Sequence, residues 1–264
     1  MESQFHEGFY SFAKYYDIAF DFKNVPQECR FLESVFTKHT QRPLTSFIEF
    51  GSGPALHCIE MARTLKQVTA VDLSSEMTAY AKFKAQQAGV NVNCECADMI
   101  HYQSTQRYDL TTLLMDSTSY LLTNANVIDH LRSVAGILNP GGLYILEMSH
   151  PKGIFEMAKT TVNDWEMERD GVRVKIKWGA EGDEFDPITQ LTNVSVKLEY
   201  TDGEKTGTIE DQSPQRCFTA TEFAALVAAS GVFEIVEYYG AMKSEVPFNN
   251  EEKAWRMVPI LRKI

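Results

Sequence analysis

The sequence predicts an α/β fold, a doubly wound and mostly parallel seven-stranded Rossmann-like sheet with an inserted antiparallel β meander. Between residues 46 and 148, strand and helix patterns alternate, which indicates a parallel sheet with right-handed crossovers. From about Trp165 to Gln212 the apolar residues instead recur with period two, as they do in paired antiparallel strands. One more helix pattern and two strand patterns then complete the sheet.

The composition is that of a globular protein with a substantial core. The chain has 264 residues, enough for one large α/β domain or one domain with an insertion, and 44% of them are hydrophobic. No apolar run is long enough to cross a bilayer, and residues 1–4 begin no basic-then-apolar signal pattern. The five cysteines are odd in number and form no Cys-x-x-Cys pair. We therefore expect a cytoplasmic protein with no disulfide framework, no metal site and no membrane partner.

The charge balance argues against one class of partner. The net charge is −11, from 36 acidic and 25 basic residues, and the Lys and Arg residues form no cluster. A protein that neutralises nucleic-acid phosphates needs a basic face. We therefore expect no nucleic-acid partner.

The first predicted strand leads into a glycine turn. Residues 47–50 are apolar and β-prone, and the residues after Pro54 repeat apolar side chains at helical spacing, so Gly51 and Gly53 lie between a strand and a helix. This order is typical of a nucleotide-binding cradle. The glycines let the backbone approach a ligand, and the start of the helix offers it free N–H groups.

Two classes of ligand use such a turn. The dinucleotide fingerprint Gly-x-Gly-x-x-Gly needs a third glycine for close helix–strand packing, and Leu56 stands at that position. Glu49, two residues before the glycines, is poorly placed beside a pyrophosphate but well placed beside an ammonium group. S-adenosylmethionine carries an ammonium and a sulfonium and has no phosphate, which favours it. An NAD-dependent enzyme is a weaker alternative.

The glycine turn and the motifs that follow it resemble those of the class I S-adenosylmethionine-dependent methyltransferases. The first motif is Glu49-Phe50-Gly51-Ser52-Gly53-Pro54-Ala55, with alanine where the family usually has its last glycine. The second is Asp72, at the end of the predicted strand 68–71, and the third is Ala97-Asp98-Met99 after the third strand. Taken alone, Asp72 is more often a helix-capping or solvated acid, Glu49 could be a salt-bridged strand end, and Asp98 could be a turn residue.

Two later motifs continue the resemblance. The fourth strand, 108–115, ends in Asp116-Ser117. A helical stripe that includes Leu131 and Leu138 follows, and Pro140-Gly141-Gly142 then turns the chain into the fifth strand, 144–148. Five motifs in this order and spacing cover residues 45–150 closely.

The resemblance implies how the cofactor would be held. In the family, residues at the positions of Asp72, Asp98 and Met77 contact the ribose hydroxyls, the adenine amino group and the adenine face. The family also begins with a Tyr-Tyr-Asp stretch whose tyrosine reaches the methionine end, which points to Tyr16 first and Tyr15 second, although aromatic residues there could simply pack a helix on the sheet. The expected cofactor-binding residues are Tyr16, Glu49, Gly51, Ser52, Gly53, Asp72, Leu73, Met77, Asp98, Met99 and Met115.

The predicted meander and the elements after it follow from alternation and turn residues. The alternating apolar residues of 172–178 fall on one face, and those of 194–200 fall on another. Asp170-Gly171 and Asp202-Gly203 are placed as two-residue hairpin turns. A capping box over Thr219–Glu222 then opens a helix that runs to Gly231. The closing strands are predicted at 233–239 and 255–261.

These patterns divide the chain into two parts. We expect a cofactor-binding core of residues 1–150 and 216–264, with an N-terminal helical cap, and an inserted β subdomain of residues 151–215. In family members that methylate glycine or aminosugars, an antiparallel sheet in this place covers the active site and helps oligomers form. The resemblance thus implies a lid over a small-molecule acceptor and a possible homo-oligomer through the insertion. A surface embellishment without contact to the site is the alternative.

The expected activity is methyl transfer from S-adenosylmethionine to a small molecule, first an amine and second a hydroxyl or carboxylate, with S-adenosylhomocysteine as product. This reaction needs a lone pair held in line with the methyl group, away from water. The candidate catalytic residues lie where strands end or the last helix begins: Asp116, Tyr120, His150 and Arg216. His150 could equally be a structural hydrogen bonder, and Arg216 could form an ion pair instead. A noncatalytic S-adenosylmethionine-binding sensor or scaffold remains open.

Overall fold

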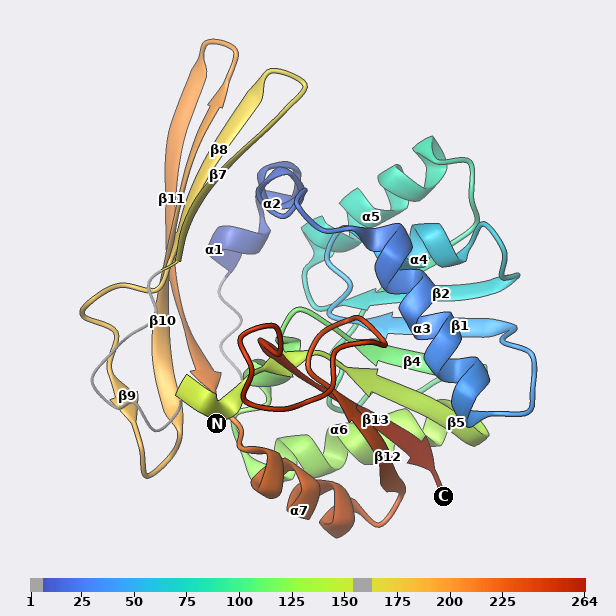
Figure 1. Ribbon diagram of the computed structural model, residues 1–264. Coiled ribbons are helices and arrows are strands. Elements are labelled where there is room, and N and C mark those ends of the chain that lie inside the picture. Colours follow the sequence, from blue (N-terminus) through green and yellow to red (C-terminus); the bar gives the residue numbers. More distant parts are fainter. Residues whose placement is uncertain (1–6, 154–162) are drawn as a thin grey trace.

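The computed structural model describes residues 7–153 and 163–264. It contains a mixed β-sheet with helices on both faces and, beside it, a separate antiparallel sheet, with α1 (Glu7–Tyr10) and α2 (Ala13–Ala19) between the two (Figure 1). The described residues do not include 1–4, from which we expected no signal peptide, or 154–162 of the predicted insertion. None of the described helices is long and apolar enough to cross a membrane.

The core sheet has the strand order β12-β13-β5-β4-β1-β2-β3, and the short strand β6 pairs with β13. Its strands are β1 (Ser46–Phe50), β2 (Gln67–Asp72), β3 (Asn93–Cys96), β4 (Tyr108–Leu113), β5 (Leu138–Leu146), β6 (Met148–Ser149), β12 (Phe233–Tyr239) and β13 (Arg256–Lys263). Strands β1 to β5 pair in parallel, whereas β13 is antiparallel to β5 and β12. The predicted mostly parallel seven-stranded sheet is confirmed, with β6 as a short addition.

Helices cover both faces of this sheet (Figure 1). One face carries α3 (Val25–His39), α4 (Leu56–Met61) and α5 (Ser75–Gln87), and the other carries α6 (Asn124–Ile137) and α7 (Ala220–Ser230). All residues of β1 and β4 are buried as a result. The strand order reverses between β1 and β4, and such a switch point leaves a crevice at the carboxyl ends of the strands.

Capping side chains set where the helices begin. The predicted capping box is confirmed: the Thr219 hydroxyl accepts a hydrogen bond from the Glu222 backbone N–H, and the Glu222 carboxylate accepts one from the Thr219 N–H. Gly231 ends α7 in the left-handed conformation, with φ of 69°. Ser74 caps α5 directly after the β2 strand.

Two local predictions are shifted in the structure. Leu138 begins β5 instead of ending the α6 stripe, and the segment up to Gly142 forms a bulge, because Pro140 cannot continue a helix and Gly141 adopts φ of 68°. Asp170-Gly171 is a two-residue hairpin turn as predicted. The second hairpin turns one residue later than predicted, at 203–204, because its only positive φ falls on the glycine.

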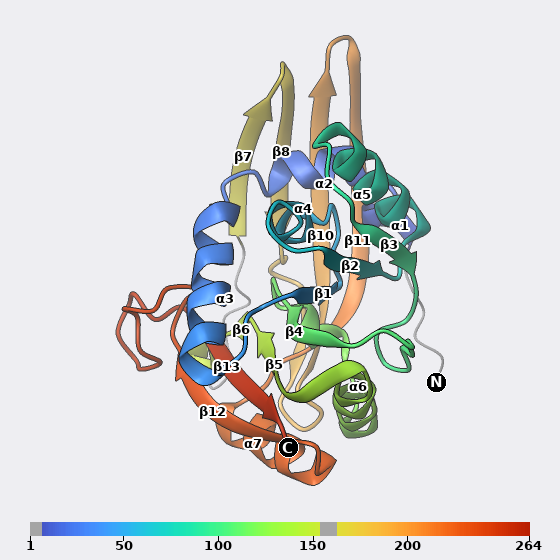
Figure 2. The ribbon, with the colours of Figure 1, turned by 90° about the vertical axis from the view of Figure 1, so that its right-hand side faces the viewer.

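The second sheet has the order β11-β10-β8-β7, with the short β9 paired to β10. Its strands are β7 (Asn163–Arg169), β8 (Val172–Trp178), β9 (Phe185–Asp186), β10 (Leu191–Asp202) and β11 (Lys205–Arg216). All described pairs in it are antiparallel. Its two hairpins extend beyond the core at the top of Figure 2.

One face of this second sheet is apolar and packs on the N-terminal helices. Ile176 pairs with Leu198 across β8 and β10, so the two apolar stripes, placed on separate faces by the sequence, share one face. That face packs against Phe9 and Ile18 of α1 and α2. The opposite face carries charged residues such as Arg173, which pairs with Glu168. The N-terminal helices therefore join the second sheet to the core.

Candidate active site

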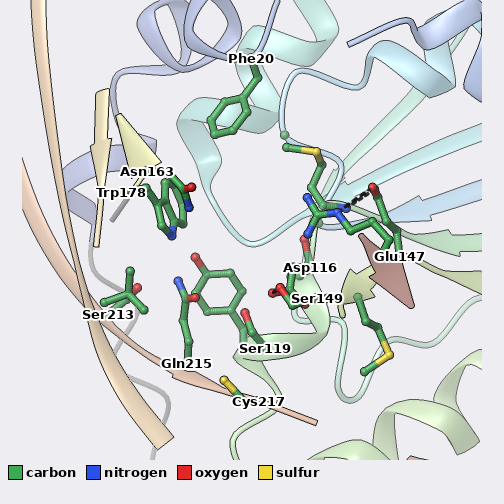
Figure 3. Close-up of a pocket in the computed structure, with 18 of the residues that line it drawn as sticks. Phe20, Asp116, Ser119, Glu147, Ser149, Asn163, Trp178, Ser213, Gln215 and Cys217 are labelled. Atoms are coloured by element: carbon green, nitrogen blue, oxygen red, sulfur yellow. Dashed lines mark hydrogen bonds and ion pairs between the residues drawn. The ribbon is translucent and has the colours of Figure 1, made fainter. Parts of the chain in front are cut away.

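A cavity of about 1720 Å³ lies between the carboxyl ends of the core strands and the second sheet. This exceeds the roughly 300–1,000 Å³ of a usual ligand pocket, so it has room for a cofactor and a second small molecule. We call the lining residues of the glycine turn and of the ends of β2 and β3 the core wall (Gly51, Gly53, Asp72, Asp98 and Met99). The lining residues of α1, of the loop after β4 and of the second sheet, which surround the rest of the cavity, are called the insertion-side wall (Tyr10, Asp116, Tyr120, Trp178 and Ser213). Figure 3 shows Trp178 and Ser213 of the second sheet facing Asp116 across the cavity.

The glycine turn brings backbone to the edge of the cavity. Gly51 and Gly53 line it with φ of 56° and 50°, a conformation that disfavours other side chains. A Cβ at Gly51 would lie 3.0 Å from the Ser117 hydroxyl oxygen, so the turn also packs tightly on the loop after β4. Ser52 is buried between the glycines, and its N–H donates to the carbonyl of Val71. The turn therefore offers a close backbone surface to a ligand.

Asp72 ends β2 beside this turn. Its Oδ2 accepts a hydrogen bond of 2.7 Å from the Gly53 N–H, and its Oδ1 accepts one of 2.9 Å from the Ser74 N–H. Burial raises the pKa of Asp72, and these two backbone bonds oppose that shift. An ionised carboxylate offers about four acceptor sites, so two remain for hydroxyl groups in the cavity. Leu73, 42% exposed, lines the cavity next to it.

Residues after β3 continue the core wall. Asp98 and Met99 line the cavity. The Asp98 Oδ1 accepts a hydrogen bond of 2.8 Å from the Ile100 N–H, which fixes the loop. Met77, expected at the adenine face, is fully buried in α5 and is not among the lining residues.

Tyr16 covers the glycine turn from α2. A Cβ at Gly53 would lie 3.6 Å from the Tyr16 ring, and Tyr16 lines the cavity. Burial raises the pKa of Tyr16, so it remains a neutral phenol. Tyr15 points elsewhere: its ring stacks on Tyr200 of the second sheet at 4.0 Å, and it does not line the cavity. The structure therefore brings Tyr16, the first expectation, to the site and leaves Tyr15 outside it.

The loop after β4 is strained and holds an acid. Met115 and Asp116 are consecutive non-glycine residues with φ of 55° and 61°, and both line the cavity. The Asp116 Oδ1 accepts a bond of 2.9 Å from the Ser149 N–H, and its Oδ2 accepts one of 2.5 Å from the Ser149 hydroxyl. Burial raises the pKa of Asp116, and the bonds from Ser149 oppose the rise. Asp116 is thus a fixed acid on the insertion-side wall.

Tyr120 meets a phenol from the N-terminal helix α1. It ends the short 3₁₀ helix η1 (Ser117–Tyr120), and its hydroxyl lies 2.5 Å from that of Tyr10, with both residues lining the cavity. Burial is the main reason that the pKa of each phenol is raised. Both therefore act at neutral pH as hydrogen-bonding phenols. Tyr10 was not among the residues expected from the sequence.

The other two catalytic candidates line the cavity but are bonded elsewhere. The His150 Nε2 lies 3.0 Å from the Asn249 carbonyl, and its Nδ1 accepts from the Lys152 N–H at 3.1 Å, which fits a neutral ring with both nitrogens occupied. Arg216 donates to Glu222 of the α7 capping box at 2.5 Å. The geometry thus favours the structural alternative for His150 and the ion-pair alternative for Arg216.

The comparisons with known proteins agree with this geometry. Residues 47–142 match the family model described as a methyltransferase domain. A putative methyltransferase of Geobacillus sp. (strain WCH70) is 26% identical over 163 residues, and the match covers 60% of this chain and 65% of that relative.

Solved structures extend the likeness to the insertion. A crystal structure of an S-adenosylmethionine-dependent methyltransferase from Clostridium acetobutylicum ATCC 824 superposes with a TM-score of 0.78 at 18% identity, covering 95% of this chain and 97% of that one. The structure of S-adenosylmethionine-bound CalS10, an amino pentose methyltransferase from Micromonospora echinaspora, gives 0.72 at 17% identity, covering 94% and 96%.

Residues 47–142 therefore form a methyltransferase domain, and the chain as a whole shares the fold of solved S-adenosylmethionine-dependent methyltransferases. S-adenosylmethionine is bound in the CalS10 structure, and two features of the present structure fit that molecule. Gly51 and Gly53 adopt positive φ where the backbone meets the cavity, and a Cβ at Gly51 would crowd Ser117. The Asp72 carboxylate keeps acceptor sites for a diol. Neither the glycine turn nor Asp72 needs a phosphate group on the ligand.

A buried chain of alternating charges, which no sequence pattern indicated, supports the glycine turn. It starts at Glu49, whose carboxylate does not line the cavity: Oε1 lies 3.2 Å from His57 Nδ1, and Oε2 accepts from the Cys58 thiol. His57 Nε2 lies 2.7 Å from Glu28. Burial alone would lower the pKa of His57, but Glu49 and Glu28 together raise it to about 9. His57 is therefore protonated at neutral pH, and its ion pair with Glu49 supports the glycine turn on the side away from the cavity.

The chain of charges continues to the end of β5. Lys23 lies 3.2 Å from Glu28 and 3.6 Å from Glu147, and Arg256 lies 3.3 Å from Glu147. Glu147 is 2% exposed and lines the cavity; burial alone would raise its pKa, but Lys23 and Arg256 lower it. Glu147 directly follows the buried strand β5, and this position could have marked it in the sequence as a site residue. Its partners come from distant segments and gave no such signal.

Proposed function

We propose that this methyltransferase moves the methyl group of S-adenosylmethionine to an amine nitrogen of a small molecule. The observation that carries the proposal is the single cavity, which joins the core wall to the acid and phenols of the insertion-side wall. The likeness to the amino pentose methyltransferase CalS10 supports an amine as acceptor. The net charge of −11 also suits a cationic substrate better than an anionic one.

The core wall would hold the cofactor. Asp72 would accept hydrogen bonds from the ribose hydroxyls, Asp98 would accept one from the adenine amino group, and Tyr16 would close over the methionine end. Glu49, expected beside the ammonium group, would instead act through His57 by holding the turn. The bound cofactor supplies an electrophilic methyl group on a sulfonium.

The insertion-side wall would hold the acceptor. Asp116 attracts an ammonium group into the cavity, where the carboxylate can take its proton. Asp116 would thereby carry the displaced proton and leave the amine neutral, with its lone pair free to accept the methyl group. Tyr120 and Tyr10 are neutral phenols because burial raises their pKa, so they orient the amine and do not serve as its base.

The second sheet would exclude water from the reaction. Trp178 and Trp165 place aromatic surface on the cavity side that lies opposite the core. An aromatic wall can also pack on a cationic or carbohydrate acceptor. This is the lid role expected for the insertion, and it does not require a homo-oligomer.

A panel of small amines, including amino sugars, tests the proposal by release of S-adenosylhomocysteine. We expect turnover of at least one amine and little or none of the matched alcohols, with loss of activity in the Asp116→Asn variant. Tight binding of S-adenosylmethionine without turnover of any panel member would favour the sensor alternative. A rise in melting temperature with NAD and none with S-adenosylmethionine would overturn the cofactor assignment.

A further inference from the structure

Helix α2 makes most of its described contacts with the second sheet. The Trp165 indole N–H donates to the Ala19 carbonyl at 2.7 Å, and the Tyr15 ring stacks on Tyr200 at 4.0 Å. Lys14 forms an ion pair with Asp202 at 2.5 Å. The same helix carries Tyr16, which covers the glycine turn of the core. Helix α2 thus packs on the second sheet, and its Tyr16 side chain reaches the proposed cofactor site.

Asp17, the next residue along, links the two parts. It is 1% exposed, and its Oδ2 accepts hydrogen bonds from Tyr80 at 2.9 Å, Lys84 at 2.9 Å and Arg169 at 2.6 Å. Tyr80 and Lys84 belong to α5 of the core, and Arg169 ends β7 of the second sheet. One carboxylate oxygen therefore joins three elements.

The hydrogen bonds of Asp17 lie outside the cavity. Asp17, Tyr80, Lys84 and Arg169 are not among the residues that line it. Asp17 bonds to helix α5 on the core side. Helix α5 begins directly after Asp72 and Ser74, next to the proposed ribose-binding residue. A buried carboxylate that loses one cationic partner becomes costly to keep in place. Loss of one partner should therefore shift α2.

We propose that Asp17 is a positioning residue that sets cofactor affinity, because its bonds to α5 and β7 hold Tyr16 over the glycine turn. The inference rests on the proposed use of S-adenosylmethionine and extends it to contacts outside the cavity. It makes the insertion part of cofactor binding as well as the cover of the acceptor. Weakening either side of the link loosens Tyr16 without removing any group that touches the cofactor.

Two matched pairs of variants test this inference. Lys84→Met and Arg169→Met each remove one partner of Asp17 while keeping most of the side-chain stem. Their controls are Lys82→Met, exposed on the same helix, and Arg173→Met, which pairs within the second sheet. The measurement is calorimetric titration with S-adenosylhomocysteine, which needs no acceptor, together with thermal unfolding of each variant without ligand.

We expect Lys84→Met and Arg169→Met to weaken S-adenosylhomocysteine binding by about fivefold to tenfold, while both controls bind like the wild type. Arg169→Lys, which keeps a cation beside Asp17, should restore most of the affinity. In a Tyr16→Ala background, Lys84→Met should have little further effect, because the ring that it positions is gone. A purely structural contact would lower the melting temperature but would not show this dependence on Tyr16.

Several results would overturn the inference. If Lys84→Met and Arg169→Met bind S-adenosylhomocysteine as well as the wild type, Asp17 has no positioning role, although the proposed function stands. If the controls are weakened equally, or if the effects of Tyr16→Ala and Lys84→Met simply add, the link does not act through Tyr16. If the wild type itself does not bind S-adenosylhomocysteine, both the inference and the proposed function fail.

Discussion

Asp72 on the core wall is held by two backbone N–H groups, whereas Tyr120 on the insertion-side wall is held by the phenol of Tyr10 from helix α1. The first arrangement comes from neighbouring strands and their turns, so it forms when the sheet forms. The second depends on side chains that meet only after α1 and the second sheet have docked. The comparison teaches that the proposed donor site forms together with the core sheet, whereas the phenol pair of the proposed acceptor site forms only when distant segments pack together.

The largest effect should come from the acid of the insertion-side wall. Asp116→Asn keeps the shape and the Oδ1 acceptor for the Ser149 N–H but removes the charge and the second acceptor oxygen, so kcat for a turned-over amine should fall on the order of 100-fold. Affinity for S-adenosylhomocysteine should stay that of the wild type, because the core wall is untouched. Steady-state kinetics and calorimetric titration measure the two quantities, and a loss of cofactor affinity without a loss of kcat would break the comparison.

The opposite result is expected on the core wall. Asp72→Ala removes two charge-assisted acceptors for the ribose and frees the Gly53 N–H, so S-adenosylmethionine should bind about 30-fold more weakly. Equilibrium titration with the cofactor is the measurement, with melting temperature as the control for folding. Unchanged affinity would mean that the ribose lies elsewhere and that the motifs have been assigned in the wrong register.

The same difference explains what the sequence could predict. Glycines that need positive φ, a strand-end acid and a capping box are local requirements, so Gly51, Gly53, Asp72 and the start of α7 could be located from neighbouring residues. The alternation of strand and helix patterns then indicated the mostly parallel sheet. The fold and the core wall could therefore be predicted from the order of the residues along the chain.

Contacts between distant segments left no local pattern. Tyr10 and Tyr120 are 110 residues apart, and Asp17 and Arg169 are 152 apart, so no spacing rule connects them. Glu49 illustrates the converse, since its position in the motif suggested a ligand contact while the structure turns its carboxylate toward His57. The direction of a buried side chain depends on its packing partners, which a single sequence does not specify.

The third effect concerns the two phenols of the insertion-side wall, whose loss should change acceptor binding and leave cofactor binding unchanged. Tyr120→Phe removes the hydroxyl bonded to Tyr10, and we expect KM for the acceptor to rise about tenfold with unchanged cofactor affinity. Tyr10→Phe should have a similar effect, and the double variant should be little worse than either single one, because the two changes remove one shared bond. Independent, additive effects would show that the two hydroxyls do not work together.

The smallest effect concerns pH and the support of the glycine turn. The pKa of His57 is raised in the folded protein to about 9, so the stability that it contributes is complete below its usual value and is lost as pH rises through about 9. Between pH 7 and 9 the free energy of unfolding should fall by about 1 kcal/mol per pH unit from this group. Thermal unfolding of the wild type and His57→Gln measures the slope, and an equal slope in both would exclude His57 as its source.

The central claim is that one cavity takes the methyl donor on its core wall and the acceptor on its insertion-side wall. A crystal structure with S-adenosylhomocysteine tests it most directly. We predict the ribose hydroxyls on the Asp72 carboxylate, the Tyr16 ring over the glycine turn, and the sulfur facing Asp116 and Tyr120. A nucleoside bound away from Asp72, or a sulfur that faces away from the insertion-side wall, would contradict the account.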